Sequence, residues 1–388
     1  MKFSRLILLL PFTFFLGSCQ PSGSDSDFAI MGYYVPPSED YRPQDLPLGQ
    51  LTHIIYSFTE VIDNEMKFPR ERHDTLLRKL VDQRQYHPDV KYMIACGGWG
   101  GSGGFSEMAA TLETRTRFIE SVIRFLEEYE LDGVDMDWEY PGLPGAGNPH
   151  MDADRENFTA LMKGLREAMD ATGKKYILTF ASAGWEKYYD YVDLEEVMKY
   201  ADYMNVMTYD LVGGQTPVTG HHTNLGWIRV EDLEGTPAME LLEQMEEEVT
   251  PGSTEKIIAY CMDLGVDPAQ MVVGAAFYGK GWVGVPADNN GLYQPNRGGW
   301  NNWLAYSRIR EEYENKNGFS RYWDPKAKAP YLFNAADSLF ITYDDTMSVR
   351  LKTEYAMDLE LGGIMFWQLR LDAGEDGLLD AIYKAARE

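Results

Sequence analysis

The sequence has few cysteines, few histidines and a minority of basic residues. Only 3 of its 388 residues are cysteine. Cys96 and Cys261 lie far apart in apolar segments, which favours buried free thiols over a disulfide framework. The 6 histidines show no metal-ligand spacing, so we expect no metal and no cofactor. With 35 basic against 61 acidic residues the formal net charge is −26, which argues against nucleic acid or an anionic membrane surface as a partner.

Internal repeats and low-complexity tracts are also absent from the sequence, and beyond its first residues no apolar run is long enough to cross a bilayer. Aromatic side chains, in contrast, are plentiful at 13%, with 9 tryptophans and 25 tyrosines. Many of these rings belong in a core, but the flat apolar faces of sugar rings also stack on aromatic planes. An apolar content of 44% excludes general disorder.

The first residues have the pattern of a targeting segment. A basic start precedes an apolar run from Leu6 to Leu16, and the run ends in Leu16-Gly17-Ser18-Cys19. This ending resembles the lipobox of bacterial lipoproteins. It implies a signal peptide at 1–18, a lipid anchor on Cys19 and a polar tether at 19–27. The expected location is the bacterial cell envelope, anchored to a membrane and facing outside the cytoplasm, and the alternative is an ordinary cleaved signal peptide.

From residue 28 to 388, short β-rich runs alternate with amphipathic helical runs. The predicted strands begin at Phe28, Thr52, Lys91, Asp132, Tyr176, Asp202, Met271 and Gly362. The clearest predicted helices span about 114–129 and 154–171, and a third begins at Thr346. Eight strands with helical crossovers predict an α/β fold, a (β/α)8 TIM barrel. Its active site is then expected at the carboxyl ends of the strands.

The connection between the seventh and eighth predicted strands is longer than one crossover helix requires. Residues 282–340 are rich in Tyr, Trp, Asn, Gly and Pro and predict a small α+β insertion within the barrel. The large aromatic residues of this segment could either form its own core or stack on sugars, and we expect most of them to be core. They are Trp300, Trp303, Tyr322 and Trp323.

Three acidic residues occupy alternate positions of the fourth predicted strand. In DGVDMDWEY, Asp135, Asp137 and Glu139 point to the same face, which in a barrel is the inside. Three neighbouring carboxyls cannot all ionise cheaply, so at least one pKa must rise, as a general acid at neutral pH requires. Glu139 is the last of the three and lies nearest the mouth of the barrel, which makes it the candidate proton donor.

These residues belong to a wider set of motifs. DGVDMDWEYP resembles the D-G-x-D-x-D-x-E signature of family 18 glycoside hydrolases, the chitinase family. The resemblance extends along essentially the whole mature chain. Further motifs follow in the family's order, namely KYMIACGGW, MNVMTYD, AFYGKGW, FITYDDTMSVRLK and GGIMFWQL.

The resemblance implies hydrolysis of β-1,4-linked N-acetylglucosamine polymers with retention, by a mechanism in which the 2-acetamido group of the substrate is the nucleophile. Glu139 is then the acid and later the base. Asp137 holds the acetamido group, Asp135 sets the charge of Asp137, and Tyr209 donates its hydroxyl to the acetamido group. The implied substrate-binding residues are Trp367, Asp210, Met207, Tyr33, Phe58, Trp99, Gly98, Met365 and Tyr140. The implied partner is a polysaccharide or oligosaccharide substrate, and we expect a monomer.

The sequence departs from the family's pattern at three positions, where Ala95, Gly100 and Lys280 replace a serine, a polar residue and an arginine. These departures affect binding details and pH dependence rather than the acid. Two alternatives remain at this point. One is an endo-β-N-acetylglucosaminidase that acts on N-glycan cores, and the other is a non-catalytic chitin-binding lectin, although such lectins usually lack the acid. The sequence does not decide between endo and exo cleavage.

Overall fold

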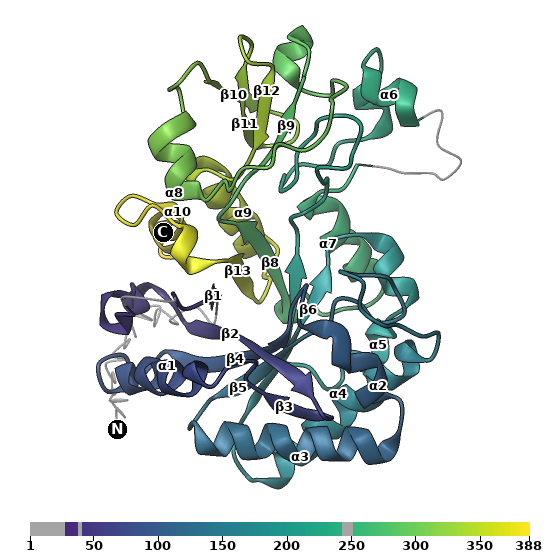
Figure 1. Ribbon diagram of the computed structural model, residues 1–388, viewed down its shortest axis with the longest axis vertical. Helices are drawn as coiled ribbons and strands as arrows, with labels where there is room; N and C mark the ends of the chain where they lie inside the picture. The colour runs from purple at the N-terminus through teal and green to yellow at the C-terminus, as the bar shows by residue number, and fades with distance from the viewer. Residues whose placement is uncertain (1–27, 38–40, 243–250) are drawn as a thin grey trace, which may run out of the picture.

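The computed structural model describes residues 28–37, 41–242 and 251–388 (Figure 1). The predicted signal peptide (1–18), the tether (19–27) and Cys19 lie outside the described residues. Two sheets organise the rest of the chain, one of them a closed parallel barrel and the other a smaller antiparallel sheet above it in Figure 1.

The barrel consists of the eight runs that the sequence predicts as strands. They are β1 (Ala29–Tyr34), β2 (His53–Ile62), β4 (Lys91–Gly97), β5 (Gly133–Asp137), β6 (Ile177–Ala183), β7 (Tyr203–Met207), β8 (Met271–Ala276) and β13 (Gly363–Trp367). They pair in the order β1-β13-β8-β7-β6-β5-β4-β2, and β1 also pairs with β2, which closes the sheet. The prediction of a (β/α)8 barrel is confirmed. An additional short strand, β3 (Glu65–Lys67), pairs antiparallel with the end of β2.

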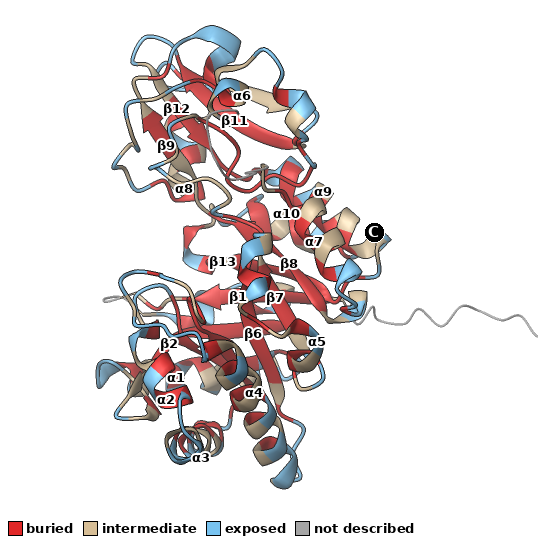
Figure 2. Cartoon of the chain, turned by 90° about the vertical axis from the view of Figure 1, so that its right-hand side faces the viewer, coloured by how far each residue is buried: buried red, intermediate tan, exposed pale blue. Residues whose placement is uncertain are grey.

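Side chains alternate between the inside and the outside of the barrel, as the period of a strand requires. On β1, Ala29, Met31 and Tyr33 belong to the inner cluster, whereas Ile30 and Tyr34 belong to the outer core between strands and helices. Both faces of the strands are therefore covered, and Figure 2 shows them buried over nearly their whole length.

The outer core is completed by amphipathic helices. The described helices are α1 (Arg72–Val81), α2 (Phe105–Ala109), α3 (Leu112–Glu128), α4 (Asp154–Ala171), α5 (Leu194–Val197), α6 (Pro237–Leu242), α7 (Thr254–Asp263), α8 (Tyr306–Arg308), α9 (Thr346–Asp358) and α10 (Leu378–Ala385). The bounds of α4 agree with the sequence prediction. α3 begins earlier than predicted because Thr111 caps it, with its side chain accepting a hydrogen bond from the Thr114 amide.

The smaller sheet lies between the seventh and eighth barrel strands in the chain. Its strands are β9 (Lys280–Val283), β10 (Ser320–Asp324), β11 (Ala329–Asn334) and β12 (Leu339–Thr342), in the order β10-β11-β12-β9. Its own core contains Trp282, Leu292, Phe333 and Phe340. Because the segment follows the carboxyl end of β8, it stands on the side of the barrel where the catalytic residues are expected.

Both cysteines among the described residues, Cys96 in β4 and Cys261 in α7, are buried and free, as the sequence predicts. Burial raises the pKa of each thiol to about 12. Neither thiol is therefore a ready nucleophile. Within the described residues no helix is long and apolar enough to cross a bilayer.

Candidate active site

The row of carboxyls lies at the end of β5. Asp135 and Asp137 point into the barrel, and Glu139 follows directly after the strand. All three are buried, with exposed fractions of 0%, 5% and 8% in that order. The row therefore runs from the closed interior of the barrel toward its mouth, as the alternation along the strand predicts.

Asp135 is the carboxyl with the most hydrogen-bond donors. It accepts from the Tyr33 hydroxyl at 2.9 Å, the Thr179 hydroxyl at 2.6 Å and the Asn205 amide at 3.1 Å. Burial raises the pKa of Asp135 to about 6, and these three donors keep it from rising further. Asp135 is thus a carboxylate at neutral pH.

Asp137 differs from Asp135 in its hydrogen bonding. Its Oδ1 atom is buried and has no hydrogen-bond partner in the described part of the chain. Burial, followed by the charges of Glu139 and Asp135, raises the pKa of Asp137 well above its usual value. The ionised form of this carboxyl is therefore disfavoured by burial and by the two neighbouring acidic groups.

Glu139 is held by its backbone. Its amide donates to the Ser102 hydroxyl at 2.9 Å, and its carbonyl accepts from the Asn148 side chain at 3.2 Å. Burial raises the pKa of Glu139 to about 7, a hydrogen bond with Tyr140 lowers it in part, and the charge of Asp210 raises it. A carboxyl of this pKa is suited to proton transfer near neutral pH.

Tyr209 covers Met365 at the centre of the barrel mouth. The Tyr209 hydroxyl lies 3.8 Å from the Met365 sulfur. Met365 is completely buried and does not line the cleft, contrary to its predicted place in a substrate-binding wall. Both Met365 and Trp367 point inward from β13, but Met365 lies one layer deeper, beneath Tyr209.

Asp210 is held by three side chains that converge on it. The Tyr278 hydroxyl donates to its Oδ1 at 2.6 Å, the Lys280 ammonium lies at 2.8 Å and the His222 ring at 3.7 Å. Burial acts to raise the pKa of Asp210, but His222 and Lys280 outweigh it and hold that pKa well below its usual range. Asp210 is therefore a fixed negative charge beside Glu139, and Lys280 is its neighbouring cation.

Aromatic rings form one side of the site. Trp367 stacks on Phe58, with ring centroids 5.4 Å apart, and meets Tyr33 at 5.9 Å. Gly98 approaches the Phe58 ring so closely that a Cβ atom there would lie 2.8 Å from it, and its φ of +83° favours glycine. Non-proline cis peptide bonds join Ser57 to Phe58, Glu139 to Tyr140 and Trp367 to Gln368.

These groups surround a cleft of about 1150 Å³. The predicted site residues that line it are Tyr33, Phe58, Gly98, Trp99, Asp137, Glu139, Tyr140, Met207, Tyr209, Asp210 and Trp367. Further lining residues were not in the predicted set, among them Trp185, Tyr278, Lys280 and Trp303. The structure thus brings the predicted residues together, with Asp135 and Met365 in the layer beneath.

The aromatic residues of the insertion differ from one another. Trp300 packs on Tyr313 and Phe319 at 5.7 and 6.2 Å, as expected of a core residue. Trp303 does not belong to that core, because its side chain is 63% exposed and lines the cleft. Trp303 is thus the exception among residues of which most were expected to be core, and its backbone lies in the loop between β9 and α8.

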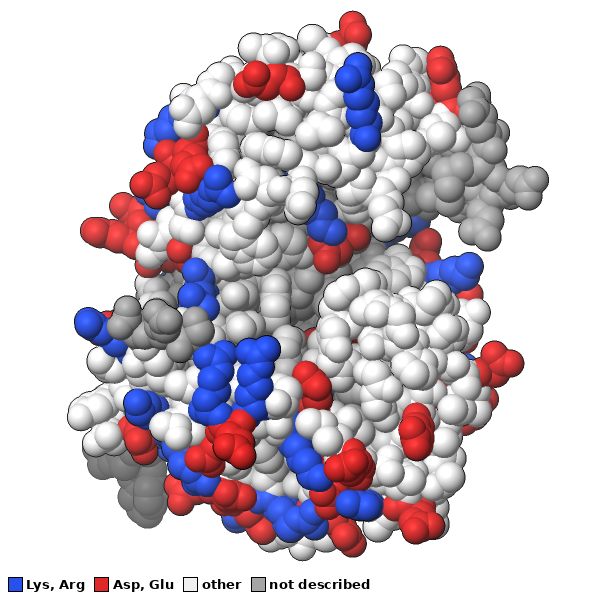
Figure 3. All heavy atoms as spheres, viewed as in Figure 1, with Lys and Arg blue, Asp and Glu red and all other residues white. Residues whose placement is uncertain are grey.

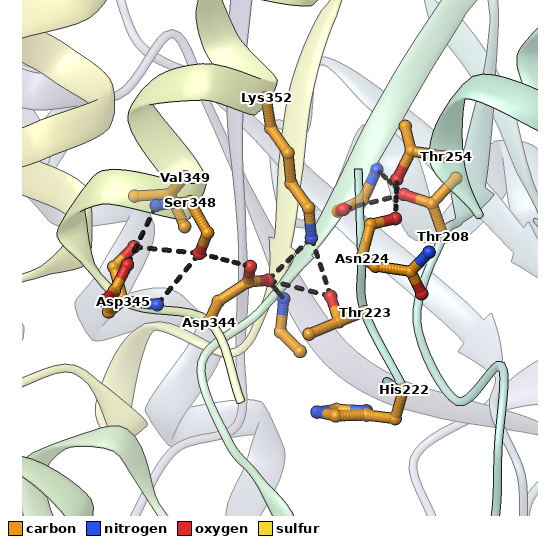
Figure 4. Close-up of polar contacts among 12 residues, drawn as sticks. Thr208, His222, Thr223, Asn224, Thr254, Asp344, Asp345, Ser348, Val349 and Lys352 are labelled. Atoms are coloured by element: carbon orange, nitrogen blue, oxygen red, sulfur yellow. Dashed lines mark hydrogen bonds and ion pairs between the residues drawn. The ribbon is translucent and has the colours of Figure 1, made fainter. Parts of the chain in front are cut away.

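A buried ion pair joins helix α9 to the segment that follows β12 (Figure 4). Asp344 accepts from the Lys352 ammonium at 2.7 Å, the Thr223 hydroxyl at 2.8 Å and the Ala276 amide at 3.0 Å. Ser348 donates to its other oxygen at 2.7 Å. The pair therefore fixes the end of β8, helix α9 and the segment that leads to His222 in one arrangement.

Within the described residues no group of three or more histidine, cysteine or acidic side chains is placed to hold a metal ion. A second hollow of about 780 Å³ lies at the opposite end of the barrel, lined by residues such as His53, Lys91 and Tyr203. It is formed by the starts of the strands, where barrel enzymes do not place catalytic groups. The cleft at the end of β5 is therefore the candidate active site.

Comparison with known proteins agrees with this assignment. The family model of glycosyl hydrolases family 18 matches residues 29–372. The chain is 33% identical to chitinase A1 of Niallia circulans, over 95% of this chain and 60% of that protein. It is 29% identical to chitinase B of Serratia marcescens, over 91% of this chain and 83% of that one. The chain thus spans less than two thirds of the length of the Niallia protein.

A solved structure of a family 18 N-acetylglucosaminidase from Paenibacillus barengoltzii is similar in fold and sequence. Its TM-score is 0.79 at 36% identity, covering 92% of this chain and 99% of that one. Chitinase ChiA74 from Bacillus thuringiensis gives a TM-score of 0.83 at 28% identity, covering 93% and 70%. The family match spans the whole barrel and includes the strand that carries the carboxyl row, so the chain is a glycoside hydrolase and belongs to glycosyl hydrolases family 18.

Proposed function

We propose that this enzyme cleaves β-1,4-linked N-acetylglucosamine chains, as in chitin and chitooligosaccharides, and that the acetamido group of the substrate is its nucleophile. The observation that carries the proposal is the difference in pKa between the carboxyls at the end of β5. Glu139 has a pKa of about 7 and faces the cleft, whereas Asp137 beneath it has a pKa raised well above its usual value. The covalent step of an ordinary retaining glycosidase needs a carboxylate nucleophile, and the raised pKa of Asp137 disfavours that ionised form.

In the proposed reaction Glu139 gives its proton to the glycosidic oxygen while the acetamido oxygen attacks the anomeric carbon. The glycosidic bond breaks, and an oxazolinium ion forms within the substrate. Asp137 accepts a hydrogen bond from the acetamido N–H, and the Tyr209 hydroxyl orients the acetamido oxygen. Water then attacks the anomeric carbon and gives its proton to Glu139, so the configuration is retained and the acid is regenerated. Trp367 supports the apolar face of the sugar at the cleavage point.

The mechanism is tested by substrates with and without the acetamido group. The enzyme should cleave chitohexaose, and cellohexaose should remain intact because it lacks the nucleophile. The α or β configuration of the first product, read by NMR before mutarotation, should match that of the substrate bond. Cleavage of cellohexaose at a comparable rate, or an inverted product, would exclude the mechanism.

The similarity to the Paenibacillus N-acetylglucosaminidase favours a second candidate within the same chemistry, the release of single N-acetylglucosamine units from chain ends. Mass analysis of early chitohexaose products distinguishes the two. Monomer together with pentamer indicates exo release of single sugars, whereas a spread of dimers to tetramers indicates chitinase-type cleavage. The relatives described above are named as chitinases and an N-acetylglucosaminidase, so the N-glycan alternative is not favoured.

We also propose that Cys19 carries a lipid anchor and that the enzyme works in the bacterial cell envelope, facing outside the cytoplasm. The support is the sequence Leu16-Gly17-Ser18-Cys19 after a short apolar run. The proposed chemistry is compatible with that location, because polymers of N-acetylglucosamine are too large to enter the cytoplasm intact.

A further inference from the structure

Trp303 is a large apolar side chain left open to solvent on the rim of the cleft. Its exposed fraction of 63% compares with 0% for Trp282 in the core of the same insertion. Two other tryptophans of the chain that are not fully buried, Trp323 and Trp227, lie under the guanidinium groups of Arg321 and Arg229. In the described part of the chain, no aromatic ring and no cationic side chain packs on the ring of Trp303. Trp303 lines the cleft, and tryptophan is enriched among the residues that contribute most to binding.

The backbone around Trp303 is fixed. Its carbonyl accepts from the Arg308 guanidinium at 3.1 Å, and the same guanidinium nitrogen donates to the Asn302 side chain at 2.6 Å. The carbonyl of the next residue, Leu304, accepts from the Gly279 amide at 2.7 Å, and the Trp300 amide donates to the Gly281 carbonyl at 2.7 Å. These contacts hold the backbone of the loop in one arrangement, so little backbone freedom is lost when the loop takes part in binding.

The segment that hydrogen-bonds to this loop, residues 279–281, also contacts the candidate active site. Lys280, between Gly279 and Gly281, extends to Asp210, which lies beside Glu139. The rings on the barrel side of the cleft are different ones. Trp99 and Trp185 contact Tyr140 at centroid distances of 6.3 and 5.0 Å. The cleft therefore has an aromatic rim contributed by barrel loops and a separate one contributed by the insertion.

We propose that Trp303 is a sugar-binding platform that stacks on a pyranose ring of the substrate away from the cleavage point and sets the preference for longer chains. The inference rests on the proposed function and names a specificity residue for it. Trp303 lines the same cleft as Trp367, the proposed support at the cleavage point, but it belongs to the insertion between β8 and β13, whereas Trp367 is on β13 itself. Binding energy gained at such a remote ring is used at the reacting centre, so its loss affects long substrates more than short ones.

The test compares Trp303→Ala with the wild type on chitohexaose and on a short aryl chitobioside. The expected result is a loss of about tenfold in kcat/KM on the hexamer, the effect of losing one well-placed aromatic contact, and a change within about twofold on the chitobioside. Trp303→Phe should recover most of the hexamer activity, because a phenyl ring retains a stacking face. Trp227→Ala is the matched control, since it removes a partly exposed tryptophan that does not line the cleft.

The outcomes separate the two proposals. A wild type that cleaves neither chitooligosaccharide overturns the proposed function itself. A wild type that cleaves both, with a Trp303→Ala variant equally impaired on both or unimpaired on the hexamer, overturns only the platform. A thermal melt of each variant checks folding, and a hexamer-specific loss also shown by Trp227→Ala would assign the effect to a general surface change.

Discussion

At the residue scale, the three carboxyls of β5 differ in what surrounds them. Asp135 receives three hydrogen bonds, Asp137 has a buried oxygen without a partner in the described chain, and Glu139 faces the cleft. The order of proton affinity therefore follows from their neighbours. Only the outermost group combines contact with the cleft and a pKa near neutrality.

Replacement of Glu139 by glutamine removes the proton donor and preserves the shape of the side chain. We expect the turnover of chitooligosaccharides to fall on the order of 10²–10⁴-fold, the usual contribution of a general acid. The thermal midpoint should not fall, because a neutral amide replaces a carboxyl whose charge is disfavoured by burial. Glu107→Gln, a change at an exposed glutamate of α2, is the control. Retention of more than about a tenth of wild-type turnover would assign the acid to another residue.

The pH dependence follows from the same group. Glu139 must be protonated to act as the acid, so kcat/KM should decrease as the pH rises through about 7. The negative charge of Asp210 raises the pKa of Glu139, and Asp210→Asn should therefore move this decrease to lower pH. The pH profile of each enzyme on an aryl chitobioside provides the measurement. An unmoved profile in Asp210→Asn would show that Asp210 does not act on the acid.

At the scale of elements, the strands and the direction of their side chains were predictable, because the apolar runs and the alternation of Asp135, Asp137 and Glu139 are visible in the sequence. The partners of Asp135 were not. Thr179 lies next to Asp135 in the pairing of β5 with β6, and Asn205 reaches it from β7, which depends on the stagger of the strands around the barrel. A polar residue at an inward position of an apolar strand was the available signal.

Most of the active-site contacts that could not be predicted from the sequence come from loops. Ser102 holds the Glu139 backbone from a glycine-rich loop, and His222 reaches Asp210 from a long connection after β7. No periodic pattern specifies where such loops return. The same holds for Trp303, which the composition of the insertion could not distinguish from Trp300, and for the three cis peptide bonds near the cleft.

The Lys352–Asp344 pair supports a prediction about stability. Both side chains are completely buried, so Lys352→Met leaves the Asp344 carboxylate without its cation. Loss of one partner of a buried pair costs about 3–5 kcal/mol, and we expect a decrease of this order in the free energy of unfolding, measured in urea. Arg350→Met on the same helix breaks an exposed pair with Glu354 and should cost less than ~1 kcal/mol. Equal costs for the two variants would contradict a structural role for the buried pair.

At the scale of the whole molecule, 61 acidic residues outnumber 35 basic ones. Figure 3 shows acidic and basic side chains interspersed along the lower part of one face, with fewer charges on the upper part. The net charge of −26 thus comes with both signs mixed on this face. The face drawn in Figure 3 shows no extended basic region of the kind that binds nucleic acid.

The proposed anchor is tested on the intact protein. In a bacterial host, Cys19→Ala should move the enzyme from the membrane fraction to the soluble fraction, because acylation requires the thiol. Cys261→Ala, at a buried cysteine, should leave the partitioning unchanged. Specific activity per folded molecule should be the same in both fractions. A Cys19→Ala variant that remains in the membrane fraction would contradict the lipobox interpretation.

The parallel direction of the barrel strands determines how an anchored enzyme is oriented. β1 enters the barrel at Ala29, and all eight strands end at the rim that carries Glu139 and Trp367. An anchor at Cys19 therefore holds the molecule by the end opposite its cleft. The nine residues 19–27 extend at most about 30 Å, so the enzyme stays within roughly that distance of the lipid. With the proposed anchor, the cleft therefore lies at the end of the barrel away from the attachment point.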